Sequence, residues 1–149
     1  MNLKVLLYHQ CEQFVAHRLE SIKTTIAEIQ ESLTSETKSS AGDKHETGRA
    51  MLQLEREKAG QQLAEIQKTN QLLSQIDIAK RSEFIGLGSL VYTTSSNYFV
   101  AISAGELKTE NLICYAISAN TPIGKLLLGK TVGDEVQFRD QAFKIIKVI

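Results

Sequence analysis

Apolar residues in the first half of the chain recur every three or four positions. From Leu19 to Leu33 the interval alternates between three and four residues, and a second series runs from Leu52 to Ile76. This alternation is typical of the a and d positions of a coiled coil. The first series is Tyr8, Cys11, Val15, Leu19, Ile22, Ile26, Ile29 and Leu33, and the second is Leu52, Ala59, Leu63, Ile66, Asn70, Leu73 and Ile76. The pattern predicts two long helices, each with one narrow apolar stripe.

A short polar stretch, residues 36–43, separates the two series. Two long helices joined by such a break are expected to fold back as an antiparallel hairpin. A helix from Tyr8 to the break rises about 1.5 Å per residue and therefore measures about 50 Å. Asn70 either fixes the register of the two helices or lies partly hydrated near the base of the hairpin.

The second half changes to short β-rich runs bounded by turn residues. Thr121 can cap a helix that has Pro122 at its first position and ends at Gly129. The expected strands are residues 87–94, 98–103, 112–118, 135–138 and 142–148. The sequence therefore predicts an α+β chain, with a coiled-coil hairpin in residues 1–80 and an antiparallel sheet with one short helix in residues 81–149.

Composition narrows the class of protein. Lys and Arg number 17 and are balanced by 17 Asp and Glu, which excludes a basic nucleic-acid binder held by bulk charge. No run of about 18 apolar residues predicts a membrane span. Cys11 and Cys114 lack metal-ligand spacing and are expected to be buried free thiols, which favours a cytoplasmic location.

Candidate chemistry is concentrated at the expected tip of the hairpin, near residues 40–48. Asp43 and Glu46 are three residues apart and share one side of a helix that starts near Asp43. One interpretation is an ordinary acidic helix start, favoured by the helix dipole. The other is a pair of hard oxygen ligands for Mg²⁺ that is weak alone and completed by a partner's site. His45 is either a third ligand or a solvated loop residue, and Lys44 and Arg49 either contact phosphate or remain solvated.

These features resemble the bacterial Gre transcript cleavage factors, GreA and GreB. The hairpin carries the family's Gly-Asp-x-x-Glu at residues 42–46. Residues 121–136 read Thr-Pro-Ile-Gly-Lys-Leu-Leu-Leu-Gly-Lys-Thr-Val-Gly-Asp-Glu-Val, which matches a second family motif over several fixed spacings. The second match is the more specific, and the two together cover both halves of the chain.

The resemblance implies a fold and a function. The C-terminal domain would be FKBP-like and would dock on RNA polymerase at the rim of its secondary channel. The hairpin would enter the channel, where Asp43 and Glu46 would share the polymerase's catalytic Mg²⁺. The polymerase would then cleave backtracked RNA, so the chain would not itself be an enzyme. Its partners would be RNA polymerase and, indirectly, the RNA 3′ end, with no membrane and no small-molecule substrate.

Three other functions remain open, and the residues after Glu46 bear on the first of them. The family usually continues Asn-Ala-Glu-Tyr, whereas this chain has Thr47-Gly48-Arg49-Ala50. A relative that enters the same channel but inhibits the polymerase would have the same architecture. A proline isomerase or chaperone built on the C-terminal domain is a second alternative, and a coiled-coil interaction module is a third.

Overall fold

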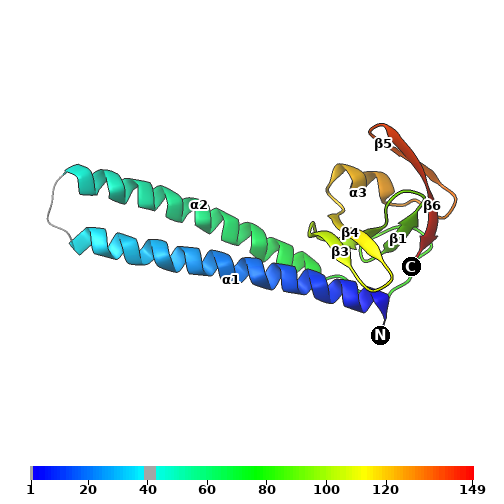
Figure 1. The fold of residues 1–149 in the computed structure, drawn as a ribbon, viewed down its shortest axis with the longest axis horizontal. Helices are drawn as coiled ribbons and strands as arrows, with labels where there is room; N and C mark the ends of the chain where they lie inside the picture. Colours follow the sequence, from blue (N-terminus) through cyan, green and yellow to red (C-terminus); the bar gives the residue numbers. More distant parts are fainter. Residues whose placement is uncertain (1, 39–42) are drawn as a thin grey trace. The chain divides into compact units, whose positions relative to one another are not determined.

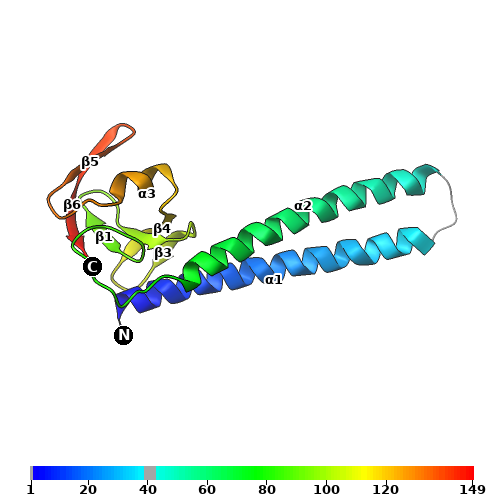
Figure 2. The same ribbon diagram turned by 180° about the vertical axis from the view of Figure 1, so that it is seen from behind.

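Two long helices form an antiparallel hairpin in the computed structural model. The structure describes residues 2–38 and 43–149, without the side chains of residues 36–38 and 43–45. Helix α1 spans Leu3–Lys38 and helix α2 spans Asp43–Ser74. They lie side by side and run in opposite directions in both ribbon views (Figures 1 and 2). The predicted helical hairpin is therefore confirmed, and α2 begins at Asp43, as the sequence predicted.

The predicted apolar stripes face each other along the hairpin. Val15 and Ile29 of α1 and Ala59 of α2 are buried, and most of the other stripe residues are half-buried. Asn70 is an exception, because it is exposed while the neighbouring Thr69 is half-buried. The interpretation that Asn70 fixes the helix register is therefore wrong. A side chain in water gains little from pairing across a seam and does not specify one alignment.

The second half of the chain forms a six-stranded sheet and one short helix. The sheet order is β3-β4-β2-β1-β6-β5. The elements are β1 (Leu90–Thr93), β2 (Tyr98–Ala101), β3 (Gly105–Lys108), β4 (Ile113–Ser118), α3 (Pro122–Leu127), β5 (Glu135–Phe138) and β6 (Gln141–Val148). The predicted fold class, a helical hairpin followed by a sheet domain with a short helix, is confirmed.

The sheet is mixed, whereas the sequence predicted an antiparallel sheet. Strand β4 pairs in parallel with β2, and the other pairings are antiparallel. The cause is β3, which the sequence analysis missed. The chain leaves β2, forms β3 and then returns as β4 between them, so β4 runs in the same direction as β2.

Two apolar layers lie on opposite faces of the sheet, because successive side chains of a strand alternate between faces. One layer contains Val91, Val100 and Ile117 together with Ile123 and Leu127 of α3. On the other face, Leu90, Phe99 and Cys114 are completely buried. Leu7, Cys11 and Leu73, from the bases of the two long helices, are also buried.

The chain divides into two compact units. One contains residues 1–14 and 71–149, and the other contains residues 15–70. Within the first unit, side chains of α1 donate hydrogen bonds to distant backbone carbonyls. Tyr8 Oη donates to Leu73 O at 2.8 Å, and Gln10 Nε2 donates to Lys108 O at 2.8 Å. The base of the hairpin thus folds with the sheet. None of the described helices is long and apolar enough to cross a membrane.

Candidate functional site at the start of helix α2

The acidic pair predicted from the sequence lies in the first turn of α2. Asp43 is the first helical residue, and Glu46 follows three positions later. Positions three apart on a helix share one side, about 5–6 Å from each other at Cβ. The unpaired N–H groups and the positive dipole end of the helix favour negative charge there. The helix boundary therefore places two carboxylate-bearing positions together at one end of the hairpin.

Only part of this site is described at the level of side chains. Glu46 is exposed, as are Thr47 and Arg49, and Gly48 is half-buried. The side chains of Asp43, Lys44 and His45 lie outside the described residues, so the roles predicted for them remain predictions. An exposed carboxylate such as Glu46 keeps its hydration and binds a hard cation weakly until further oxygen ligands are added.

The rest of the described chain offers no competing metal site. No group of three or more His, Cys, Asp or Glu side chains lies close enough to hold a metal ion among the residues searched. His9 and His17 are exposed on α1.

The motif in residues 121–136 has a structural explanation for much of its pattern. Thr121 caps α3, because its Oγ1 accepts a hydrogen bond from Gly124 N at 3.1 Å, and Pro122 occupies the first turn. Gly133 has a φ of 92° that favours glycine, and Asp134 Oδ2 accepts a hydrogen bond from Thr131 N at 2.9 Å. These residues build a capped helix and a tight turn.

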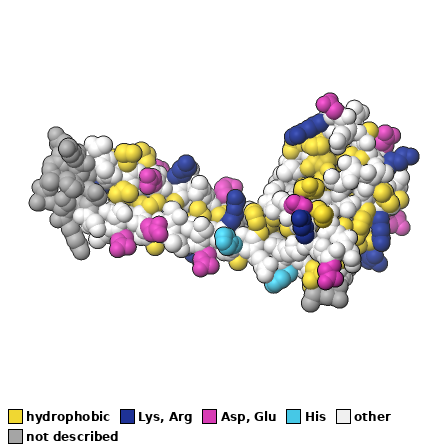
Figure 3. Space-filling model, in the orientation of Figure 1, with side chains coloured by type: hydrophobic (Ala, Val, Ile, Leu, Met, Phe, Trp, Pro, Cys, Tyr) yellow, Lys and Arg dark blue, Asp and Glu magenta, His cyan; other side chains and the backbone are white. Residues whose placement is uncertain are grey.

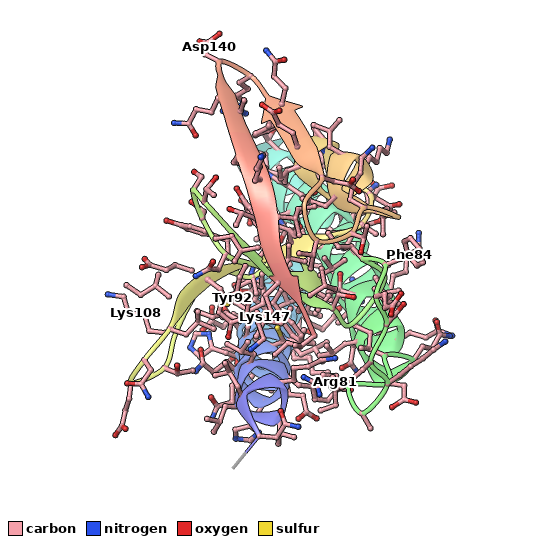
Figure 4. The ribbon with its side chains drawn as sticks, turned by 90° about the vertical axis from the view of Figure 1, so that its right-hand side faces the viewer. Arg81, Phe84, Tyr92, Lys108, Asp140 and Lys147 are labelled. Carbon is pink, nitrogen blue, oxygen red and sulfur yellow. The ribbon has the colours of Figure 1, made fainter. Side chains whose placement is uncertain are left out.

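Apolar side chains of the same motif, and of residues 84–87 beside it, are partly exposed. Five large apolar side chains are exposed on two adjoining segments: Phe84 57%, Leu87 43%, Leu126 39%, Leu128 40% and Val132 56%. The segments are tied together because Ile85 N donates to Lys130 O and Gly129 N donates to Ile85 O, both at 2.8 Å. Phe84 projects outward in Figure 4. We call these five residues the apolar face.

The apolar face was not predicted from the sequence. Leucine and valine in a short apolar run read as core residues, and only the fold separates those that point inward from those that remain exposed. Exposed apolar side chains on neighbouring segments are typical of a protein–protein contact surface. The face is therefore a second candidate functional feature, on the sheet unit.

Charges of both signs lie on the hairpin. On the face shown in Figure 3, acidic and basic side chains are interspersed along the described residues, without a continuous field of one sign. The ion pairs there are exposed, for example Lys68 Nζ to Glu65 Oε1 at 3.7 Å. Such pairs contribute little to stability and do not attract a polyanion.

Comparison with known proteins finds similar solved structures of GreA factor homologs. The Gfh1 protein of Thermus thermophilus is 22% identical, with a TM-score of 0.36 over 95% of this chain and 94% of that chain. Thermus aquaticus Gfh1 is 24% identical, with a TM-score of 0.35 over 92% of each chain. A structure of the transcription factor Gfh1 is 23% identical, with a TM-score of 0.35 over 95% of this chain and 92% of that chain. No protein-family model and no curated protein sequence matches the chain.

Proposed function

We propose that this chain is a Gre-type factor that binds RNA polymerase at its secondary channel and stimulates cleavage of backtracked RNA. The observation that carries the proposal is the start of α2 at Asp43. It places Asp43 and Glu46 together in the first turn of a helix, at one end of a helical hairpin. The motif in residues 121–136 also supports the proposal, because it resembles the second motif of the Gre factors.

The chemistry of the acidic pair suits a shared metal site. Carboxylate oxygens are ligands that Mg²⁺ accepts, and Mg²⁺ supplies a Lewis acid at a transferring phosphoryl group. Two carboxylates alone leave most of an octahedral shell to water. In the proposed complex, Asp43 and Glu46 add negative charge and oxygen ligands at the polymerase's own catalytic centre. The chain is then a stimulating factor and has no independent catalytic site.

The balance of charge is compatible with a protein partner. With a formal net charge of zero, the chain has no bulk attraction for nucleic acid. The apolar face of the sheet unit offers a contact of another kind, because burial of apolar surface does not depend on charge. We infer that this face contacts the polymerase, while the acidic pair acts at the polymerase's catalytic centre.

The decisive experiment is transcript cleavage in a stalled, backtracked elongation complex. The variant Asp43→Asn/Glu46→Gln removes both charges and preserves side-chain shape. Cleavage stimulation should fall by about 100-fold, the loss typical when one preorganised charge-stabilising group is removed. Affinity for the polymerase should be retained, because neither side chain belongs to the sheet domain.

A matched control is Glu55→Gln/Glu57→Gln, which removes two exposed carboxylates further along α2. It should leave cleavage unchanged. Equal stimulation by wild-type protein and the Asp43/Glu46 variant would exclude the proposed role of the acidic pair. Equal loss in both variants would indicate a general charge effect on binding instead.

The residues after Glu46 favour a second candidate, a channel-binding inhibitor. Arg49 is exposed and lies three positions after Glu46, so a cation shares that side of the helix. A positive charge there opposes the binding of a metal ion. An inhibitor would slow elongation without releasing short RNA fragments, whereas the leading proposal predicts that fragments appear and stalled complexes restart.

A further inference from the structure

A pocket lies beside the outer edge of the sheet, within the unit formed by residues 1–14 and 71–149. Its volume is about 490 Å³, and its lining comprises Leu3, Leu6, Gln10, Thr109, Glu110 and Asn111. Ligand sites commonly have volumes of about 300–1,000 Å³. The loop residues of the lining follow directly after β3, which is the outermost strand on that side. Lys108, the last residue of β3, marks this edge in Figure 4.

One wall of the pocket contains a hydroxyl group that has no hydrogen-bond partner. Among the described residues, Thr109 Oγ1 is the buried side-chain polar atom without one. The loop itself is fixed, because Thr109 N donates to Leu112 O at 2.8 Å. Rotation of the side chain about χ1 to present the hydroxyl to a ligand would break no hydrogen bond, and a new bond would remove the penalty of leaving the group unpaired.

The residues of α1 in the lining supply an acceptor and an apolar surface. Gln10 donates its Nε2 to Lys108 O at 2.8 Å, which leaves its Oε1 to accept a hydrogen bond. Leu3 and Leu6 are half-buried, and Glu110 is exposed. The lining thus offers an acceptor, two apolar side chains and one negative charge, and rotation of Thr109 adds a donor.

We propose that this pocket binds an extended segment of a partner protein in which an apolar side chain adjoins a lysine or arginine. The apolar side chain contacts Leu3 and Leu6, and the cation pairs with Glu110. The segment's peptide unit accepts from Thr109 Oγ1 and donates to Gln10 Oε1. An extended segment fits a site next to an edge strand, where peptides commonly bind. The partner is the polymerase, and this part of the inference rests on the proposed function.

The first test uses defined peptides and the full chain. The probes are Ac-Ala-Leu-Arg-Ala-NH₂ and two matched peptides, with Ser in place of Leu or Glu in place of Arg. The first peptide should shift the NMR signals of the Thr109, Glu110 and Asn111 amides and of the Gln10 side chain, and the other two should not. Equal shifts with all three peptides would overturn the proposal. So would the absence of shifts at peptide concentrations up to about 10 mM, because a site with a Kd near 1 mM would then be nearly saturated.

Two variants test the roles of the polar groups. Thr109→Val should weaken binding of the first peptide by about three- to tenfold, the effect of one hydrogen bond. Its thermal midpoint should equal or exceed that of the wild type, because the unpaired hydroxyl is gone. Glu110→Gln should weaken binding by about threefold at low salt and by less at high salt. Glu135→Gln, on the opposite edge strand, is the control and should leave peptide binding unchanged. Unaltered peptide binding in both Thr109→Val and Glu110→Gln would contradict the proposed roles of these two residues.

The second test measures affinity for RNA polymerase. Glu110→Lys should weaken it, and Glu135→Lys should not. If the wild type binds and Glu110→Lys binds equally well, the pocket is not a polymerase contact and the proposed function is unaffected. If the wild-type chain does not bind polymerase at all, the proposed function fails, and the peptide titration still decides whether the pocket recognises this class of segment.

Discussion

Cys11 and Cys114 show how burial decides the chemistry of single residues. Both side chains are completely buried and free of disulfide bonds. Burial raises the pKa of the Cys11 thiol to about 12, with a smaller contribution from Cys114. Burial also raises the pKa of the Cys114 thiol to about 11. The thiolate is the nucleophile and metal ligand, so neither residue is suited to catalysis at neutral pH. The sequence prediction of buried free thiols is confirmed.

Thiol labelling checks this conclusion. At pH 8, the folded chain should react with a chromogenic disulfide reagent at least 100-fold more slowly than glutathione. The pKa of Cys11 is raised by about three units, which lowers the thiolate fraction about 1,000-fold, and burial blocks access of the reagent. Both thiols should react rapidly in denaturant. Rapid labelling of either cysteine without denaturant would show that it is accessible and ionised in the folded chain.

Gly124 is fixed by a close backbone approach. A Cβ atom at this position would lie 2.2 Å from Ser118 O and 3.0 Å from Ala119 Cα. The glycine of the Thr-Pro-Ile-Gly motif is thus needed for α3 to pack on the chain that leads into it. The same contact explains why the motif has a glycine at this position, which hydrophobic periodicity alone does not account for.

The variant Gly124→Ala should lower the free energy of unfolding by about 3 kcal/mol, since backbone atoms must move to relieve the overlap. Gly86→Ala is the matched control, because a Cβ there meets nothing within 4 Å. It should change stability by less than about 0.5 kcal/mol. Urea unfolding followed by circular dichroism measures both; similar losses in the two variants would contradict the packing argument.

At the scale of elements, local chemistry made some predictions reliable. Thr121, Pro122 and Gly129 mark the limits of α3, and the helix is observed as Pro122–Leu127 with Gly129 at a φ of 80°. Cap, proline and glycine act within a few residues, so the sequence contains the information needed. Strand β5 was also predicted with its observed limits. The signal is again local, because a tight turn at Arg139 and Asp140 directly follows the strand.

Elements that depend on distant partners were not predictable in the same way. Strand β3, Gly105–Lys108, contains one buried residue, Leu107, and carries no apolar alternation that would predict it. Its existence depends on pairing with β4. The parallel pairing of β2 with β4 follows from this return of the chain and has no local signal.

The base of α2 offers a test of which residues hold the helices. Leu73 is 2% exposed, whereas Asn70 is exposed less than one turn earlier. Leu73→Ala should lower the free energy of unfolding by about 3 kcal/mol, and Asn70→Ala should change it by less than about 0.5 kcal/mol. Thermal and urea unfolding measure both. A large loss on replacing Asn70 would restore a register-fixing role for it.

For the whole molecule, the sequence predicted where the acidic pair lies but not the second contact surface. Asp43 and Glu46 follow the polar break, and a helix start is readable from such a break. The apolar face comes from segments about 40 residues apart that only the backbone hydrogen bonds of the fold bring together. No pattern in either segment distinguishes its exposed leucines and valine from core residues.

The variant Phe84→Ser/Val132→Ser tests the apolar face as the polymerase contact. It should weaken polymerase binding at least tenfold while the thermal midpoint changes little, because both side chains are more than half exposed. Ile113→Ser/Ile146→Ser replaces two similarly exposed side chains elsewhere on the sheet. This control should bind normally. Equal affinities of the two double variants would show that the face is not the contact.

The division of the chain into units has a consequence for its biosynthesis. Residues 1–14 leave the ribosome before residues 71–149, yet both belong to the same compact unit. Residues 15–70, by contrast, need only each other for their helical contacts, and such local contacts form quickly. Leu7 and Cys11 must therefore remain uncovered until the sheet has been translated. During that interval the nascent chain is a helical hairpin with an exposed apolar base, a form suited to transient chaperone binding.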